Sequence, residues 1–302
     1  MKTRVFTRRQ FIKLSMGAAA SLGLSKVAMG DKLLTGESAA LKPAVVWMEA
    51  QDCTGCTESV LSVLTPDLRD FILDTVAIRY HETIMAATGQ VAETALDAAI
   101  AEGGYVLVLE GSIPAADERY LQVAGHSVES KFIEAASNAA VVLAVGACSA
   151  YGGIPRAGVP NGQSAEFFLN KHNVTKPLIN LPGCPVHPLW FFDTVNAYLA
   201  GNSIPVDQYK RPLSHFNQTV HSLCHRKGNY EKQAYLQDWN DPAQRNLCLL
   251  LKGCKGVDTH GDCPFIKWNE GANWCGDNNA PCAGCTEPQF YDQFSPLFKN
   301  QQ

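Results

Sequence analysis

The stretch AVVWMEAQDCTGC, residues 44–56, joins two signals that decide the fold. Its first seven residues form a short apolar run, which is typical of a buried β-strand. Two cysteines, Cys53 and Cys56, follow almost at once. In doubly wound sheets, ligands bind at the carboxyl ends of the strands. The sequence therefore predicts that this cysteine pair lies at such an edge.

Residues 42–200 repeat the same alternation of short apolar runs and stretches with helical spacing. Such alternation predicts a parallel, doubly wound α/β sheet, formed by one large first domain over 42–200. Further strands are expected at 75–81, 105–111, 140–146 and 177–183, and helices at 58–74 with a break at Pro66, 94–103, 131–139 and 187–201.

After residue 202 this rhythm stops. Gly, Asn, Asp, Pro, Cys and Trp dominate the stretch, and seven of the eleven cysteines lie there. A long segment with weak periodicity needs another source of stability, and inorganic clusters can serve as its core. We therefore expect a second, smaller and irregular domain over 201–302.

The first 30 residues have the three parts of an export signal. The basic start MKTRVFTRRQFIK precedes the apolar run LSMGAAASLGL and small residues. Arg8-Arg9, followed by Phe11 and Lys13, resembles a twin-arginine signal, with an ordinary secretory signal as the alternative. The twin-arginine route predicts export to the periplasm in the folded state, with a cofactor already inserted.

Charge and hydropathy narrow the possible partners. Without residues 1–30, the chain has 19 basic and 29 acidic residues, a net charge of −10. Such a surface gives no support to nucleic-acid binding. No second apolar run reaches the roughly 18 residues of a membrane span, so we expect no transmembrane helix in the mature protein.

Four cysteines follow predicted parallel strands. Cys53 and Cys56 follow the first strand, Cys148 follows 140–146, and Cys184 follows 177–183. Because these strand ends share one edge, four thiolates converge there, the number that a cubane iron–sulfur cluster needs. The alternatives are inert buried cysteines or a redox CxxC pair, which leaves Cys148 and Cys184 unexplained.

The remaining cysteines are one short of two sites with four ligands each. His221, three residues before Cys224, can supply the missing ligand, whereas His225 is adjacent to Cys224 and therefore a poorer choice. Structural zinc is a rival for such sites. The seven cysteines are Cys224, Cys248, Cys254, Cys263, Cys275, Cys282 and Cys285.

These motifs resemble one family along essentially the whole chain, the small, electron-transferring subunits of periplasmic nickel–iron hydrogenases. The resemblance implies a flavodoxin-like sheet domain followed by a cluster-binding domain. It is carried by RRQFIK (8–13), CTGCTES (53–59), EGSIP (110–114), GACSAYGGIP (146–155), PGCP (182–185), HSLC (221–224), CLLLKGCKG (248–256), DCPFIKWN (262–269) and PCAGCTEP (281–288).

The resemblance also implies three groups of cluster ligands. Each group is named here for the cluster it holds in the family. The proximal 4Fe–4S group is Cys53, Cys56, Cys148 and Cys184; the distal 4Fe–4S group is His221, Cys224, Cys248 and Cys254; the medial group is Cys263, Cys282 and Cys285.

One departure from the family pattern concerns Cys275. Many members have a proline at this position and a 3Fe–4S medial cluster, whereas the nickel–iron–selenium branch has a cysteine and a 4Fe–4S cluster. We therefore expect Cys275 to complete the medial group, so that all three clusters are 4Fe–4S, with 3Fe–4S as the alternative.

The implied activity is reversible hydrogen oxidation, in which this chain passes electrons and has no catalytic residue. The nickel–iron site is expected only in a large partner subunit. The external acceptor is expected to be a soluble multihaem cytochrome c or a separate membrane partner. The other functions considered are an electron-transfer subunit similar to one of respiratory complex I and a zinc-stabilised binding protein.

Polar residues beside the proximal cysteines allow two interpretations each. The hydroxyls of Thr54, Thr57 and Ser149 can donate hydrogen bonds to sulfur or cap helices. Glu58 and Glu110 can act at the subunit interface or in a proton relay, or can serve as capping carboxylates.

Overall fold

The computed structural model describes residues 42–290, except 66 and 159. The predicted export signal lies outside these residues. The first half of the chain forms the expected parallel sheet, in the strand order β2-β1-β3-β7-β9. This order is the flavodoxin-like one. Its strands are β1 (Ala44–Glu49), β2 (Ala77–His81), β3 (Val106–Glu110), β7 (Val141–Val145) and β9 (Leu178–Leu181).

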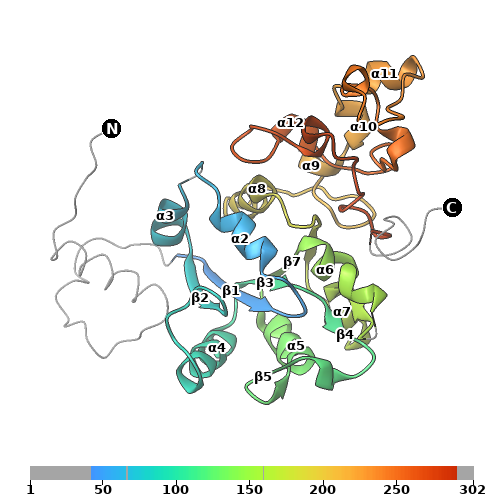
Figure 1. The fold of residues 1–302 in the computed structure, drawn as a ribbon. Helices are drawn as coiled ribbons and strands as arrows, with labels where there is room; N and C mark the ends of the chain where they lie inside the picture. Colours follow the sequence, from blue (N-terminus) through green and yellow to red (C-terminus); the bar gives the residue numbers. More distant parts are fainter. Residues whose placement is uncertain (1–41, 66, 159, 291–302) are drawn as a thin grey trace.

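Helices cover both faces of the sheet (Figure 1). Alternate residues of a strand point to opposite faces. Val45 and Trp47 of β1 therefore pack with α2 (Gly55–Leu61) and α8 (Pro188–Leu199). Val46 and Met48 pack in a second core on the other face. That core also contains residues of α4 (Gln90–Glu102), α5 (Val128–Asn138) and α7 (Ala165–Lys171).

The prediction of one helix over 58–74 is wrong in its extent. The observed elements are α2, which ends at Leu61, α3 (Leu68–Asp70) and the π-helix η1 (Phe71–Thr75). The residue before a proline avoids helical backbone angles, so the chain around position 65 cannot continue the helix. The other helices and strands predicted over 42–200 are confirmed, with small shifts in their ends.

The remaining elements of the first half are short. β4 (Ile113–Pro114) pairs antiparallel with β8 (Gly162–Gln163), and β5 (Gln122–Val123) forms a short hairpin with β6 (His126–Ser127). The helix α6 (Gly146–Tyr151) begins directly after β7. Two 3-10 turns, η2 (Glu118–Tyr120) and η3 (Ile154–Ala157), complete this half.

The second half has little regular structure, as the sequence predicts. Within residues 202–290 no helix exceeds five residues, and no strand joins the central sheet. Its elements are α9 (Leu213–Phe216), α10 (Val220–Leu223), α11 (Lys227–Glu231), η4 (Pro242–Gln244), η5 (Leu250–Lys252), α12 (Cys263–Ile266) and η6 (Cys275–Asn278). In the described part of the chain, no helix is long and apolar enough to cross a membrane.

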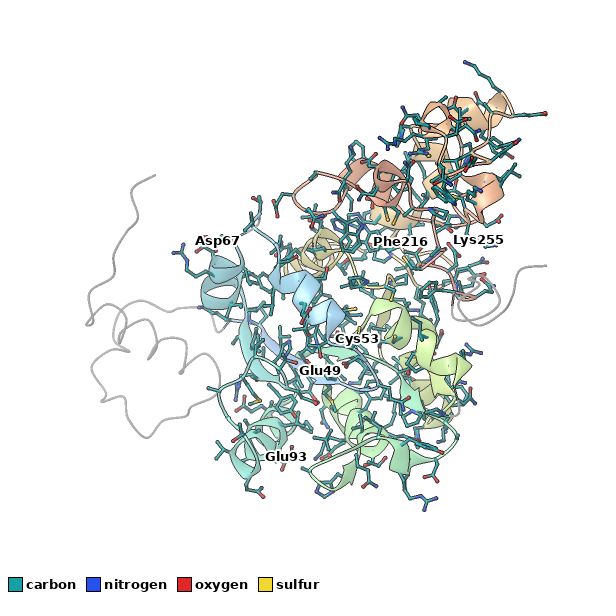
Figure 2. The ribbon with its side chains drawn as sticks, in the orientation of Figure 1. Glu49, Cys53, Asp67, Glu93, Phe216 and Lys255 are labelled. Atoms are coloured by element: carbon teal, nitrogen blue, oxygen red, sulfur yellow. The ribbon has the colours of Figure 1, made fainter. Side chains whose placement is uncertain are left out.

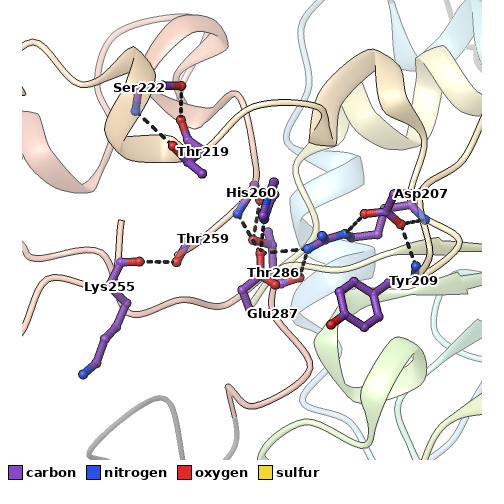
Figure 3. A network of polar contacts seen from close by, with 10 residues as sticks. Asp207, Tyr209, Thr219, Ser222, Lys255, Thr259, His260, Thr286 and Glu287 are labelled. Atoms are coloured by element: carbon purple, nitrogen blue, oxygen red, sulfur yellow. Dashed lines mark hydrogen bonds and ion pairs between the residues drawn. The ribbon is translucent and has the colours of Figure 1, made fainter. Parts of the chain in front are cut away.

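A buried ion network attaches the end of the described chain to the loop after α8 (Figure 3). The Arg211 guanidinium donates to Asp207 at 2.7 Å and to Glu287 at 2.8 Å. Glu287 also accepts the backbone N–H of His260 at 2.6 Å. Because the Arg211 side chain is only 2% exposed, its charge depends on these two carboxylates.

His215 makes a second connection, between Asp262 and α8. Its Nδ1 lies 2.8 Å from Asp262 and its Nε2 lies 3.3 Å from Asp193. Burial alone lowers the pKa of His215, but the hydrogen bonds and charges of Asp193 and Asp262 outweigh it and raise the pKa from 6.5 to about 9. The folded protein therefore holds this imidazole in its charged form.

This pKa predicts a pH-dependent stability. A pKa that folding raises stabilises the protein fully below the unfolded value of 6.5, and this stabilisation is lost as the pH rises through about 9. At one pKa unit per 1.4 kcal/mol, the loss is on the order of 3 kcal/mol. Urea midpoints should fall across this pH window, and His215→Gln should remove most of the fall. An equally steep fall in the variant would contradict the assignment.

Candidate iron–sulfur cluster sites

The four proximal cysteines lie at the carboxyl ends of β1, β7 and β9. Burial first, and then the charges of Cys184 and Cys53, raise the pKa of Cys148 to about 12. After burial and the charge of Glu110, the charges of Cys148 and Cys184 also raise the pKa of Cys56. The four sulfurs are thus electrostatic neighbours, at the edge of the sheet where Figure 2 labels Cys53. Thiols buried in this way become thiolates when a metal replaces their protons.

Glycines leave space beside the proximal sulfurs. A Cβ atom on Gly146 would lie 2.5 Å from the Cys56 sulfur, and one on Gly153 would lie 2.7 Å from the Cys148 sulfur. Both glycines also have positive φ angles, +83° and +54°, which favour glycine. Any other residue at either position would push a sulfur away, so the backbone is shaped around these two thiols.

Glu110 is a buried carboxylate at the start of α2. It accepts the backbone N–H of Cys56 at 2.9 Å, the Thr57 hydroxyl at 2.5 Å and the Trp47 indole N–H at 3.2 Å. Burial raises its pKa. These bonds favour the capping interpretation of Glu110, and they show that the Thr57 hydroxyl donates to this carboxylate. Glu58, by contrast, is exposed.

All four distal residues line one pocket of the second half: His221, Cys224, Cys248 and Cys254. Two of them come from α10 and its end, and the other two lie on either side of η5. Burial and then the charge of Lys227 lower the pKa of His221. This shift favours the neutral imidazole, which is the form that binds metals.

Cys275 lies near the other three cysteines that the sequence groups as medial, and also near Cys254 of the distal group. The Cys263 thiol is deeply buried, and its pKa is raised by burial and then by Cys285, Cys282 and, less strongly, Cys275. Burial and the charges of the same neighbours likewise raise the pKa of Cys285. The irregular chain from 263 to 285 thus brings together the four residues that the sequence groups as medial.

The medial cysteines adjoin both other groups. The charge of Cys184 in the proximal group contributes to the raised pKa of Cys285 in the medial group. At the other end, the charge of Cys254 in the distal group adds to burial in raising the pKa of both Cys275 and Cys282. The medial cysteines therefore lie between the other two groups, an arrangement suited to stepwise electron transfer.

The donor atoms of the described residues give no support to a site for a single zinc ion. Zinc needs its ligand atoms within about 2.0–2.3 Å of one ion. In the described residues, no three His, Cys, Asp or Glu side chains converge closely enough to hold one metal ion. His225, which the sequence ranks as the poorer ligand, lies 3.4 Å from Asp277 instead.

Two unpartnered buried donors lie beside these candidate ligands. The Trp274 indole N–H, in the wall of the distal pocket, has no acceptor among the described residues, and neither does the Ser149 hydroxyl beside Cys148. A buried donor without an acceptor costs about 1–3 kcal/mol. The sulfur atoms of a bound cluster are acceptors that would satisfy both groups.

Sequence reasoning missed several residues of these walls. Gly146 and Gly153 carry a weak signal, because each stands within five residues of Cys148 in a Gly-rich motif. Arg226 carries none, since nothing local shows that a charged residue after Cys224 is buried. Its contacts depend on distant parts of the chain.

The chain matches two family models. The model of the C-terminal part of NiFe/NiFeSe hydrogenase small subunits matches residues 216–298. The family of the NADH ubiquinone oxidoreductase 20 kDa subunit matches residues 53–198. The similarity to a complex I protein thus spans the sheet half, and the hydrogenase model spans the cysteine-rich half.

Curated relatives match over nearly the whole chain. The periplasmic [NiFe] hydrogenase small subunit 1 of Nitratidesulfovibrio vulgaris is 37% identical, over 98% of this chain and 94% of its own. The periplasmic [NiFeSe] hydrogenase small subunit of Desulfomicrobium baculatum is 35% identical, over 97% and 98%.

A solved structure matches the fold as well. It is that of the Desulfomicrobium baculatum [NiFeSe] hydrogenase, with a TM-score of 0.80 and 32% identity over 87% of this chain and 100% of the other. The expected sheet and family are confirmed together. The chain belongs to the small subunits of NiFe and NiFeSe hydrogenases, and it is the electron-transferring subunit of a heterodimeric hydrogenase.

Proposed function

We propose that twelve residues hold three iron–sulfur clusters, through which electrons pass between the large subunit and an external acceptor. Bound clusters supply one-electron redox chemistry. One observation carries the proposal: the medial cysteines adjoin both other groups, because Cys282 lines the same pocket as Cys254 and Cys285 is an electrostatic neighbour of Cys184. The ligands are Cys53, Cys56, Cys148, Cys184, His221, Cys224, Cys248, Cys254, Cys263, Cys275, Cys282 and Cys285.

Several other groups orient the ligand cysteines or donate hydrogen bonds to them. Glu110 fixes the start of α2, and so orients Cys56. The backbone N–H of Val186 donates to the Cys56 sulfur at 3.4 Å, and that of Arg226 donates to the Cys224 sulfur at 3.4 Å. Hydrogen bonds to sulfur tune cluster potentials. No residue of this chain is proposed to cleave hydrogen.

We also propose the chain's organisation and cellular setting. Residues 1–30 are a twin-arginine signal, 42–200 the flavodoxin-like domain with the proximal cluster, and 201–302 the domain with the other two. The curated relatives named above are described as periplasmic, which supports export to the periplasm. The external acceptor is a soluble multihaem cytochrome c or a separate membrane partner.

Purification of the native heterodimer tests this proposal. The complex should be brown, contain about four iron atoms for each of the three groups, and reduce a dye in the presence of hydrogen. A colourless complex that binds zinc would overturn it. Identification of the redox protein that co-purifies would settle the acceptor.

The medial cluster gives a sharper test through Cys275→Pro. Cys275 is the first residue of η6, where proline is tolerated, and Trp274 before it is already extended (φ −138°, ψ 178°). We expect a folded protein that has lost about one iron atom and gains the electron paramagnetic resonance (EPR) signal of an oxidised 3Fe–4S cluster.

The matched control is Asp277→Asn, in the same turn but without a ligand atom. It should keep the iron content of the wild type. If the wild type itself shows an intense 3Fe–4S signal, Cys275 is not a medial ligand.

A further inference from the structure

Arg226 is a buried cation without an anionic partner among the described residues. The residue is only 4% exposed. Its guanidinium donates to four neutral oxygens: Arg245 O at 3.1 Å, Leu247 O at 2.8 Å, Gly276 O at 2.8 Å and Asn279 Oδ1 at 2.6 Å. Carbonyl and amide oxygens satisfy hydrogen bonds but do not cancel a full charge. A buried charge left in this way is costly, so a partner must compensate it.

Arg211 is a buried arginine of the same protein whose charge is compensated by carboxylates. Its guanidinium is equally buried, and it contacts Asp207 and Glu287 at 2.7 and 2.8 Å. The acidic residue nearest in sequence to the Arg226 acceptors is Asp277. Its carboxylate instead contacts Lys267 at 3.1 Å and His225 at 3.4 Å.

The Arg226 side chain lines the distal pocket. That pocket is also lined by His221, Cys224, Cys248 and Cys254. Arg226 Nε is buried and has no acceptor among the described residues. The Arg226 backbone N–H also donates to the Cys224 sulfur at 3.4 Å. The free N–H and the positive charge thus belong to the wall of the same pocket as the proposed ligands.

We propose that Arg226 is a positioning residue whose guanidinium is the fixed counter-charge of the distal cluster, and that it raises the reduction potential of this cluster. The inference rests on the proposed distal ligand set. A cluster bound by three thiolates gains one more negative charge on reduction. In a water-excluded pocket, a nearby cation stabilises that additional charge more than it stabilises the oxidised form.

The same side chain connects two neighbouring sites. Gly276 and Asn279, which accept from one nitrogen of Arg226, lie in the turn that begins at Cys275. Arg245 and Leu247, which accept from another nitrogen, precede Cys248. Arg226 therefore holds the turn that begins at Cys275 against the wall of the distal pocket.

Redox titration of the whole heterodimer tests the proposal. In Arg226→Gln, the distal EPR signal should need a lower potential to appear. We expect at least a tenfold loss in the ratio of reduced to oxidised cluster at a fixed potential, which equals about 59 mV for one electron. The medial signal should shift less, and the proximal signal should not move.

Two control variants separate charge from structure. Arg226→Lys keeps the charge but loses the planar fork, so it should lower the melting temperature and keep most of the potential. Asn279→Gly removes the 2.6 Å acceptor, tolerates the positive φ of 58°, and keeps Arg226. It should leave the distal potential near that of the wild type.

The outcomes separate the charge role of Arg226 from the proposed distal ligand set. A distal potential that is the same in Arg226→Gln, Arg226→Lys and the wild type would overturn the charge role of Arg226 while the proposed ligands stand. If Arg226→Gln is too unstable to purify, Arg226→Met replaces it as the variant without the charge, and the same lowered distal potential is expected. Equal potential losses in Arg226→Lys and Asn279→Gly would point to structure alone and overturn the proposal. A wild type without a distal signal would instead overturn the proposed ligand set.

Discussion

Replacing Gly146 by alanine should remove the proximal cluster. The added Cβ would lie 2.5 Å from the Cys56 sulfur, and the residue already has a φ of +83°. Because Cys56 is packed in the core of the sheet domain, its sulfur cannot move aside without leaving the group. We expect a loss of about four iron atoms per heterodimer and nearly complete loss of hydrogen-dependent dye reduction.

Gly125→Ala is the matched control. Gly125 has nearly the same φ, +81°, but nothing lies within 4 Å of an added Cβ. The Gly125→Ala variant should lose only about 1–2 kcal/mol of stability, from the strained backbone, and should keep its iron and activity. Iron analysis and EPR of the two variants provide the comparison, and the medial and distal signals should persist in Gly146→Ala. Full iron content in Gly146→Ala would show that the proximal group does not use Cys56 as described.

Arg211→Met should cause the largest loss of stability. It leaves Asp207 and Glu287 buried without their shared cation, and removing one partner of a buried pair costs about 3–5 kcal/mol. The segment that ends near Glu287 should then detach from the loop after α8. We expect the cluster absorbance to be lost at a much lower concentration of guanidinium chloride than in the wild type.

Arg119→Met provides the comparison at the surface. Arg119 contacts Asp117 at 2.5 Å, but its side chain is 82% exposed. Exposed pairs contribute about 0–1 kcal/mol, so this concentration should barely change. Similar shifts in both variants would mean that burial does not govern the Arg211 network.

The sheet half was largely predictable from the sequence. Short apolar runs such as 44–50 and 140–146 are local signals, and their alternation with helical stretches predicts parallel strands. The structure confirms this sheet and brings Cys53, Cys56, Cys148 and Cys184 to one edge, as the prediction requires. The helix over 58–74 was overextended, because helical spacing continues through a region where the backbone cannot.

The second half was predictable in its chemistry but not in its shape. The count of seven cysteines and His221 needs only the sequence. How the chain from 202 to 290 brings them together depends on contacts between residues that are far apart. Arg226, for example, bonds to oxygens 19 to 53 positions further along the chain. No local pattern encodes such partners.

The sequence by itself determined the parallel sheet, the family and the twelve candidate ligands, because periodicity and cysteine spacing are properties of short segments. Only the tertiary structure shows that Cys275 lies near the other three medial cysteines and near Cys254. It also shows that Arg211 is paired with carboxylates, whereas Arg226 contacts only neutral oxygens among the described residues. The physical reason is that burial and electrostatic neighbours follow from how distant segments pack. The charge of an arginine is known from the sequence, but only the fold determines which group pairs with it.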